Sequence, residues 1–319
     1  MAGVVLLSAM GHSAVAQETF RTGTGLVLTP VRVTDRAGKT VDGLKAKDFE
    51  LYDEGTARTF VLEEESPPVT AVVAIQTSTI SGPALAKIQK IGGLIQPLVA
   101  GEKGVAAVLT YSDKIEVRQE FTGDAALLSA AFRKIEPDGQ GSRMHDGLLE
   151  AIRLLQTKDQ ARRRILIVVG ETRDRSSEHS LQDVVTAAQA SNVVIYPVSY
   201  SATWTAFTSK GAERFEGSNR TVYNSDSRGL LAIFQEMGRA GAKNGHEVLA
   251  RYTGGLKTSF VKLSGLESVV QKVSEDLHSQ YLLAFTAMAG GGAKYRTLQV
   301  RVRGCGECTV RHRPGYFVE

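Results

Sequence analysis

Apolar runs of strand length alternate with segments of helical periodicity through the middle of this chain, and no other feature constrains its fold as strongly. The apolar runs are Val69–Ile75, Val105–Thr110, Ile165–Val169 and Val193–Val198. The helical segments between and after them are Ala84–Leu98, Asp124–Ile135, Met144–Gln156, Leu181–Ala190 and Leu266–His278. Strands that are buried on both faces form unbroken apolar runs, and parallel strands need a crossover that is usually a helix. The sequence therefore predicts an α/β fold with a doubly wound, largely parallel sheet.

The two ends of the chain show a different pattern, in which short, half-polar strands alternate with turn residues. We expect strands at Leu26–Thr34, Phe49–Tyr52, Arg58–Glu63, Tyr281–Thr286, Tyr295–Arg303 and Thr309–Phe317. The turn residues 35–39 are expected to close an antiparallel hairpin. We therefore expect a small all-β, sandwich-like module formed by residues 17–66 and 281–319. It would frame an α/β domain at 67–280, in which residues 201–245 form an irregular insertion.

The composition excludes several classes of protein. With 42% hydrophobic and 23% charged residues, the chain is neither disordered nor collagen-like. The 38 Lys and Arg residues exceed the 34 Asp and Glu residues by four, and no run of five basic residues occurs, so we expect no nucleic-acid partner. The longest basic cluster is Arg162–Arg164, which we interpret as a solvated strand edge and not as a phosphate-binding track.

The amino terminus resembles a secretory signal peptide over residues 1–16. An apolar stretch includes Val4–Leu7, and residues 14–16 form a small-x-small cleavage motif before Gln17. No Lys or Arg precedes Arg21, so the basic start of such a leader is missing, and a buried first strand is the alternative interpretation. No other segment offers about 18 consecutive apolar residues. We therefore expect an exported protein, periplasmic or extracellular, with no transmembrane segment after leader cleavage.

Cys305 and Cys308 are the whole cysteine content of the chain. Structural metal sites need about four ligands, and one nearby histidine, His312, leaves such a site incomplete. In an exported chain this pair favours a local disulfide across a hairpin turn between residues 298–303 and 309–313. A catalytic dithiol is the alternative.

Sequence signatures of catalysis are mostly absent. His246 and Glu247 begin like the zinc-binding HExxH motif, but Ala250 stands where the second histidine is needed. No GxSxG motif, P-loop or complete GxGxxG motif occurs. We therefore expect a protein that is not an enzyme. The alternative is a hydrolase whose site assembles in space from Ser78, His145 and Asp146.

The order of elements and several loop sequences resemble a von Willebrand factor A (VWA) domain, and in particular the bacterial VWFA-related family of the acidobacterial type. The phrases that carry the resemblance are residues 33–38 (VTDRAG), 41–55 (VDGLKAKDFELYDEG), 111–113 (YSD), 121–122 (FT), 252–255 (YTGG), 277–283 (LHSQYLL) and 313–317 (RPGYF). They follow one another in the family's order over most of the chain. The resemblance implies a Rossmann-like domain that binds partners through the loops at the carboxyl ends of its strands.

The resemblance also implies a metal-ion-dependent adhesion site in those loops. In the family, Asp-x-Ser-x-Ser follows the first strand, a Thr lies in the second loop, and an Asp opens the third. Here Gln76 replaces the first carboxylate, Ser78 keeps a hydroxyl, and Ile80 removes the second hydroxyl. Ser142 stands at the threonine position, so one further oxygen ligand is kept.

Glu171 takes the third-loop position in an ungapped alignment, whereas a shift of two residues would place Val169 there and leave no acid. Either alignment offers at most one of the two usual carboxylates, and the affinity of a hard cation follows ligand charge and number. The resemblance thus implies a degenerate site of Ser78, Ser142 and Glu171. We expect no resident cofactor, and only weak binding of Mg²⁺ or another divalent cation if any binds.

The resulting hypothesis is an exported interaction protein that binds another protein or an envelope polymer through these loops. Gln76, Thr79, Arg143, Arg173 and Arg175 are the candidate partner-binding residues, and the arginines would suit an acidic partner. Ordinary solvated loop charges are the alternative interpretation of the arginines. A purely structural envelope component is a further alternative for the whole protein.

Overall fold

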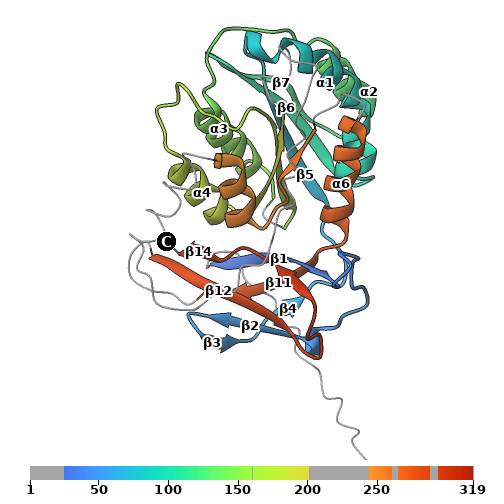
Figure 1. The fold of residues 1–319 in the computed structure, drawn as a ribbon, viewed down its shortest axis with the longest axis vertical. Coiled ribbons are helices and arrows are strands. Elements are labelled where there is room, and N and C mark those ends of the chain that lie inside the picture. Colours follow the sequence, from blue (N-terminus) through green and yellow to red (C-terminus); the bar gives the residue numbers. More distant parts are fainter. Residues whose placement is uncertain (1–24, 160, 201–243, 261–264, 288–293, 319) are drawn as a thin grey trace, which may run out of the picture.

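The computed structural model describes residues 25–159, 161–200, 244–260, 265–287 and 294–318. Its central sheet has six strands in the order β10-β9-β8-β5-β6-β7 (Figure 1). Their bounds are β5 Val69–Gln76, β6 Val105–Tyr111, β7 Ile115–Thr122, β8 Arg163–Gly170, β9 Val193–Ser199 and β10 Thr258–Ser259. All neighbouring strands are parallel except β6 and β7. The predicted doubly wound α/β sheet is therefore confirmed.

The sequence pattern did not indicate the two edge strands. β7 alternates apolar residues with Glu116, Arg118 and Glu120 and is half exposed, so it lacks the unbroken apolar run of a strand buried on both faces. β10 has only two residues, which is too short for any periodicity to be recognised.

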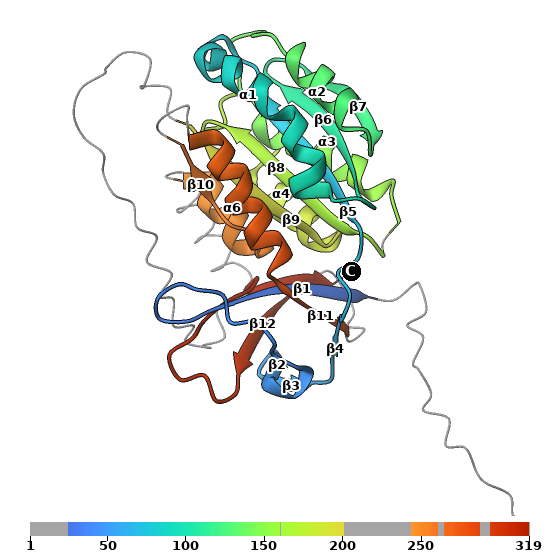
Figure 2. The ribbon, with the colours of Figure 1, turned by 90° about the vertical axis from the view of Figure 1, so that its right-hand side faces the viewer.

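Helices cover both faces of the central sheet (Figures 1 and 2). On one face lie α1 (Gly82–Leu94), its π-helical continuation Ile95–Ala100, α2 (Ala125–Arg133) and α6 (Leu266–His278). On the other face lie α3 (Met144–Gln156), α4 (Leu181–Ala190) and a helix over residues 244–253. Each face buries its own apolar cluster, because successive strand residues point to opposite sides of a sheet. Within the described residues, no helix has the length and apolar character needed to cross a membrane.

Both ends of the chain contribute to two four-stranded antiparallel sheets, with the orders β13-β1-β11-β4 and β14-β12-β2-β3. The strands are β1 Leu26–Thr34, β2 Phe49–Asp53, β3 Thr56–Arg58, β4 Val61–Leu62, β11 Tyr281–Thr286, β12 Lys294–Val302, β13 Thr309–Arg311 and β14 Gly315–Val318. A third apolar cluster, which includes Val31, Phe285 and Tyr316, fills the space between them. The predicted β module is therefore confirmed, whereas the exact domain boundaries stay predictions. Residues 1–16 and 201–243, where we expect the leader and most of the insertion, lie outside the described residues.

Three details of the β module differ from the expected strands. The turn after β1 does not close a two-stranded hairpin, because Thr34 and Thr40 form a single bridge and β1 pairs instead with β11 and β13. The expected strand Arg58–Glu63 is divided between β3 and β4, which lie in different sheets. The expected strand Thr309–Phe317 is divided between β13 and β14 around Pro314, whose nitrogen cannot donate a hydrogen bond to a sheet.

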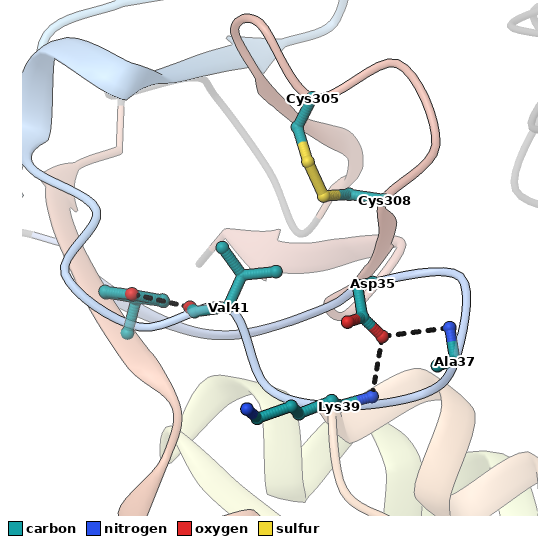
Figure 3. Close-up of a disulfide and its surroundings, with 7 residues drawn as sticks. Asp35, Ala37, Lys39, Val41, Cys305 and Cys308 are labelled. Atoms are coloured by element: carbon teal, nitrogen blue, oxygen red, sulfur yellow. Dashed lines mark hydrogen bonds between the residues drawn. A yellow bond between two sulfur atoms is a disulfide. The ribbon is translucent and has the colours of Figure 1, made fainter.

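Cys305 and Cys308 form a disulfide in the turn between β12 and β13 (Figure 3). These strands belong to different sheets, so the expected hairpin across the turn is wrong, and the disulfide closes a corner between the two sheets. The turn after β1 lies beside this corner, since Arg36 Nη1 is 3.3 Å from Glu307 Oε1. In that turn the Asp35 carboxylate accepts hydrogen bonds from two backbone N–H groups.

Arginines at the start of β8 close the amino-terminal edge of the central sheet. The interpretation of Arg162–Arg164 as a solvated strand edge is wrong, because Arg163 and Arg164 are only 5% and 7% exposed. Arg163 donates to the Leu277 carbonyl in the last turn of α6, and Arg164 donates to the Ser191 carbonyl at the end of α4. The terminal carbonyls of a helix lack intrahelical partners and carry partial negative charge, so these guanidinium groups satisfy both.

The β module packs against this same edge of the central sheet (Figures 1 and 2). Arg311 of β13 donates to the carbonyls of Gly254 and Gly255 and forms an ion pair with Asp276 of α6. Asp276 is 5% exposed, and it also accepts a hydrogen bond from the Tyr196 hydroxyl at 3.2 Å. One carboxylate therefore joins α6 and β9 of the central domain to β13 of the β module.

Asn192 makes a second contact between the two parts. It lies in the turn between α4 and β9 with a left-handed backbone φ of 52°, a conformation that asparagine tolerates better than most residues. Its side-chain amide donates to the Leu26 carbonyl at 2.9 Å and accepts from the Leu28 backbone N–H at 3.2 Å. The β module thus covers the amino ends of the parallel strands and leaves their carboxyl ends on the far side.

Asp276→Asn should destabilise the protein by about 2–3 kcal/mol, because it leaves the half-buried Arg311 guanidinium without its carboxylate while the amide still accepts one hydrogen bond. Urea unfolding of the two forms measures the difference. The matched control is Glu275→Gln, an exposed neighbour on α6 that should change stability by less than about 0.5 kcal/mol. Equal effects of the two substitutions would contradict the role of this ion pair.

Candidate functional site

Three loops meet at the carboxyl-terminal edge of the central sheet, on the side away from the β module (Figure 1). We call them the first loop (76–81, from the last residue of β5 onward), the second loop (139–146, before and into α3) and the third loop (171–180, after β8). Thr79 N–H donates to the Gly139 carbonyl and Arg175 N–H donates to the Ser142 carbonyl, each at 3.0 Å. These backbone bonds join the three loops into one surface.

Gln76 is 1% exposed and holds the first loop to the third. Its Oε1 accepts the backbone N–H of Glu171 at 2.7 Å, and its Nε2 donates to Ser78 Oγ at 2.9 Å. The Ser78 hydroxyl is also buried and lies 3.2 Å from Ser81 Oγ, where either oxygen can donate. The expected partner-binding role of Gln76 does not fit this geometry, because its side chain is enclosed by the protein.

Tyr200, the residue after β9, extends this network. Its hydroxyl donates to Ser81 Oγ at 2.6 Å, and burial raises the pKa of Tyr200 far above its ordinary value, so the hydroxyl stays neutral. Sequence reasoning missed Tyr200. The available signal was its place directly after a buried strand, at the edge where ligand sites of α/β sheets lie. We refer to Gln76, Ser78, Ser81, Glu171 and Tyr200 together as the Gln76 network.

The residues expected at the metal site do not present free oxygen ligands. Ser78 Oγ already contacts Gln76 and Ser81. Ser142 is 1% exposed, and its hydroxyl is directed to the Arg173 carbonyl at 3.4 Å. The side chain of Ile80, the residue that replaces the second hydroxyl, lies outside the described residues.

Glu171 supplies the one carboxylate of the expected metal site, and it already has a cationic partner. Arg175 Nη2 lies 3.0 Å from Glu171 Oε2. A hard divalent cation takes several oxygen ligands with negative charge, whereas this set offers one carboxylate that is already ion-paired and two hydroxyls that already form hydrogen bonds. Within the part of the chain that the structure describes, no group of three His, Cys, Asp or Glu side chains is placed to hold a metal ion. The residues present therefore do not fit the adhesion-site cation.

Two of the three candidate arginines form ion pairs with acidic residues of the same chain. Arg143 Nη2 lies 2.8 Å from an Asp146 oxygen and 3.3 Å from a Glu178 oxygen, and Arg175 pairs with Glu171. Arg173 is exposed and forms no ion pair with any described residue. An acidic partner would have to compete for Arg143 and Arg175, whereas the charge of Arg173 is available.

Asp146, in the first turn of α3, organises the second and third loops. It is 7% exposed, and its carboxylate accepts hydrogen bonds from the Arg143 side chain, the His179 ring, and the backbone N–H groups of Glu178 and His179. Burial alone would raise the pKa of Asp146, but these hydrogen bonds outweigh it and lower the pKa to about 2. The carboxylate is therefore ionised at neutral pH and holds the third loop against α3.

The third loop also caps the amino terminus of α3. The N-cap residue Arg143 makes no side-chain capping bond, and the first amides of the helix are satisfied from the third loop. His145 N–H donates to Asp174 Oδ1 and Asp146 N–H donates to Ser177 Oγ. A cap supplied from another loop leaves no local sequence signature, which is why the motif analysis did not find it.

The residues of the alternative hydrolase are not assembled for catalysis. Ser78 Oγ contacts Gln76 and Ser81, and the His145 ring lies 3.1 Å from the His179 carbonyl. None of the described contacts joins a Ser78 oxygen to an imidazole, so the nucleophile has no base.

A different serine–histidine pair lies at the carboxyl end of β9. Ser199 Oγ is 2.7 Å from His246 Nδ1, and burial of the imidazole lowers the pKa of His246 to about 3. The other ring nitrogen has no hydrogen-bond partner among the described residues. An effective base needs a pKa near the working pH and a third group that orients it, so this fully buried pair is a poor catalyst. Sequence analysis recognised His246 only as half of an incomplete zinc motif.

Comparison with known proteins agrees with this fold. Residues 86–236 match the family model described as von Willebrand factor type A domain. The match supports a VWA-domain protein with the Rossmann-like VWA fold around the central sheet. No curated protein matches the chain.

Three solved structures are similar to part of this chain, with TM-scores below 0.5. An aerotolerance-related membrane protein from Bacteroides fragilis NCTC 9343 is 16% identical with a TM-score of 0.44, and the match covers 65% of this chain and 98% of that one. The conserved hypothetical protein BatB from Bacteroides thetaiotaomicron is 13% identical with a TM-score of 0.42, over 66% and 99% of the two chains. The SpRpn10 VWA domain is 9% identical with a TM-score of 0.40, over 64% and 97%.

Asp146→Asn should lower the free energy of unfolding by about 1–2 kcal/mol at pH 7, because it removes the ionised carboxylate whose hydrogen bonds lower the pKa of this side chain. The folded-state pKa lies below the ordinary value of 3.8, so this stabilisation is fully present above about pH 5 and is lost progressively as the pH falls towards 2. Urea unfolding of both forms at a series of pH values measures it.

Asp138→Asn, in the segment leading into the second loop, is the matched control, because its carboxylate makes no described hydrogen bond or ion pair. A stability difference between wild type and Asp146→Asn that stays constant from pH 7 to pH 2 would contradict this assignment.

Proposed function

We propose that this protein is an exported interaction protein that is not an enzyme and that binds another protein or an envelope polymer through its three carboxyl-edge loops. The observation that carries the proposal is the placement of those loops. They are joined to one another by backbone bonds, and they lie at the edge opposite to the β module. VWA domains commonly bind other proteins, and the family match supports the same role here.

Export is supported by the cysteine chemistry. The two cysteines of the chain form a disulfide, and disulfides persist mainly in oxidising compartments such as the periplasm and the extracellular space. The apolar start of the sequence, followed by a small-x-small motif, supports the same location.

The proposed contact surface centres on exposed residues of the first and third loops. Thr79 and Arg173 are exposed, and Arg173 carries an unpaired charge among the described residues. Its backbone carbonyl accepts the Ser142 hydroxyl, which helps to fix the position of the chain from which this side chain projects. We propose that Arg173 contacts an acidic group of the partner, and that Arg143 and Arg175 mainly maintain the loops.

The metal-ion-dependent adhesion site is degenerate in this proposal, and the partner binds directly to protein groups. The support is the engagement of Ser78, Ser142 and Glu171 by other residues of the chain. A partner carboxylate would then meet a guanidinium group and not a bound ion.

Site-specific photo-crosslinking tests the proposal. A photoreactive amino acid at Thr79 or Arg173 should give an adduct of defined mass in the native host, whereas the same group at the exposed Glu267 of α6 should not. Arg173→Glu should reduce the Thr79 adduct about tenfold or more, because losing one charge-assisted contact at an interface commonly costs at least 1.4 kcal/mol.

The matched control for charge reversal is Arg133→Glu, an exposed arginine at the end of α2. Equal labelling from Glu267 and Thr79, or complete loss of the Thr79 adduct on addition of EDTA, would contradict the proposal.

A further inference from the structure

Gln76 is the position at which this chain departs most clearly from the expected adhesion site, and both halves of its side-chain amide are used. The carbonyl oxygen accepts from Glu171 N–H and the NH₂ group donates to Ser78 Oγ, at 2.7 and 2.9 Å. A carboxylate has no hydrogen to donate, so aspartate or glutamate could not make both bonds with the same polarity. The amide is therefore chemically specific for this position.

The Gln76 network joins the ends of three parallel strands. Gln76 is the last residue of β5, Glu171 follows β8, and Tyr200 follows β9. Hydrogen bonds run from Glu171 N–H through Gln76 and Ser78 to Ser81, which also accepts from Tyr200. Every member is at most 8% exposed, so water does not compete effectively for these bonds.

The surroundings of the amide are closely packed. A methyl group added to Gly170 would lie 2.9 Å from Gln76 Oε1 and 2.3 Å from the Tyr111 hydroxyl. Tyr111 is fully buried. Its pKa is raised well above the ordinary value, mainly by burial and to a smaller extent by the nearby carboxylates. An additional negative charge at position 76 would lie in this low-polarity region close to Glu171, whose ion-pair partner among the described residues is Arg175.

We infer that the Gln76 side chain takes the structural place of the divalent cation: it is a positioning residue that fixes the first and third loops in one arrangement without any ion. A cation in an adhesion site connects oxygen ligands from separate loops. Here the neutral amide connects two of those loops, because it accepts from Glu171 N–H of the third loop and donates to Ser78 Oγ within the first loop. As far as partner binding is concerned the inference rests on the proposed function. The hydrogen-bonded arrangement itself can be measured without a partner.

Hydrogen exchange at the Glu171 amide tests the arrangement directly, because that N–H is donated to Gln76. In wild type the amide should exchange slowly, and Gln76→Ala should speed its exchange by about tenfold or more relative to the β8 amides before it. Gln140→Ala, at an exposed glutamine of the second loop, is the matched control and should leave the rate unchanged. Unchanged exchange in Gln76→Ala would overturn the inference.

Gln76→Glu gives a second test that keeps the shape of the side chain. It should lower the Tm by several degrees at pH 7.5, and millimolar Mg²⁺ or Mn²⁺ should restore part of the loss, since an ion bound only to the folded state stabilises it. Wild type and the control Gln140→Glu should show no Tm shift with either ion. An increase in the Tm of wild type on addition of Mg²⁺ would overturn the inference. The inference would also fail if Gln76→Glu had the same Tm as the control Gln140→Glu and showed no Tm shift with either ion.

These measurements separate the inference from the proposed function. If Glu171 exchange and the ion response behave as expected while crosslinking finds no partner, the proposed function fails and the positioning role of Gln76 holds. If crosslinking succeeds but Gln76→Ala leaves the Glu171 amide unchanged, only the positioning role fails.

Discussion

The arrangement of the β module and the central domain depends on hydrogen bonds that arginine side chains donate to backbone carbonyls at helix ends. Arg163 and Arg164 hold the ends of α6 and α4, and Arg311 extends the same chemistry from the β module to the carbonyls of Gly254 and Gly255. Each helix end would otherwise bury unpaired carbonyls with partial negative charge. Asp276 adds a carboxylate that forms an ion pair with Arg311. Because the β module is held here, the opposite edge of the central sheet keeps its loops available.

The two edges of the central sheet therefore have different roles and use different side-chain chemistry. The amino-terminal edge uses charged side chains to join two structural units. The carboxyl-terminal edge buries the Gln76 network, whose hydrogen bonds join uncharged groups, and Asp146 and Asp174 hold the second and third loops together. In this arrangement the shape of the candidate binding surface is set by the chain itself. A surface fixed in advance loses less conformational entropy when a partner binds.

Local patterns in the sequence predicted much of the fold. α3, α4, α6, β1 and β11 have the predicted bounds, because amphipathic periodicity and unbroken apolar runs are properties of consecutive residues. The geometry of the candidate site was harder to predict from the sequence. Glu171 and Ser78 were found through family resemblance. Three of the four hydrogen bonds that the Asp146 carboxylate accepts come from a loop 32 or 33 positions away, and Arg163 contacts Leu277 across 114 positions. Such contacts depend on the folded topology, so neither composition nor periodicity could indicate them.

Gln76 connects the first loop to the third through its side-chain amide, without an ion. A crystal structure of the protein grown with Mn²⁺, with anomalous diffraction data, tests it most directly. The predicted result is no anomalous peak between residues 76–78 and Glu171, with the Gln76 amide bonded to Glu171 N–H and Ser78 Oγ. An ordered Mn²⁺ coordinated by Ser78 or Glu171, with Gln76 turned away from both, would contradict the claim.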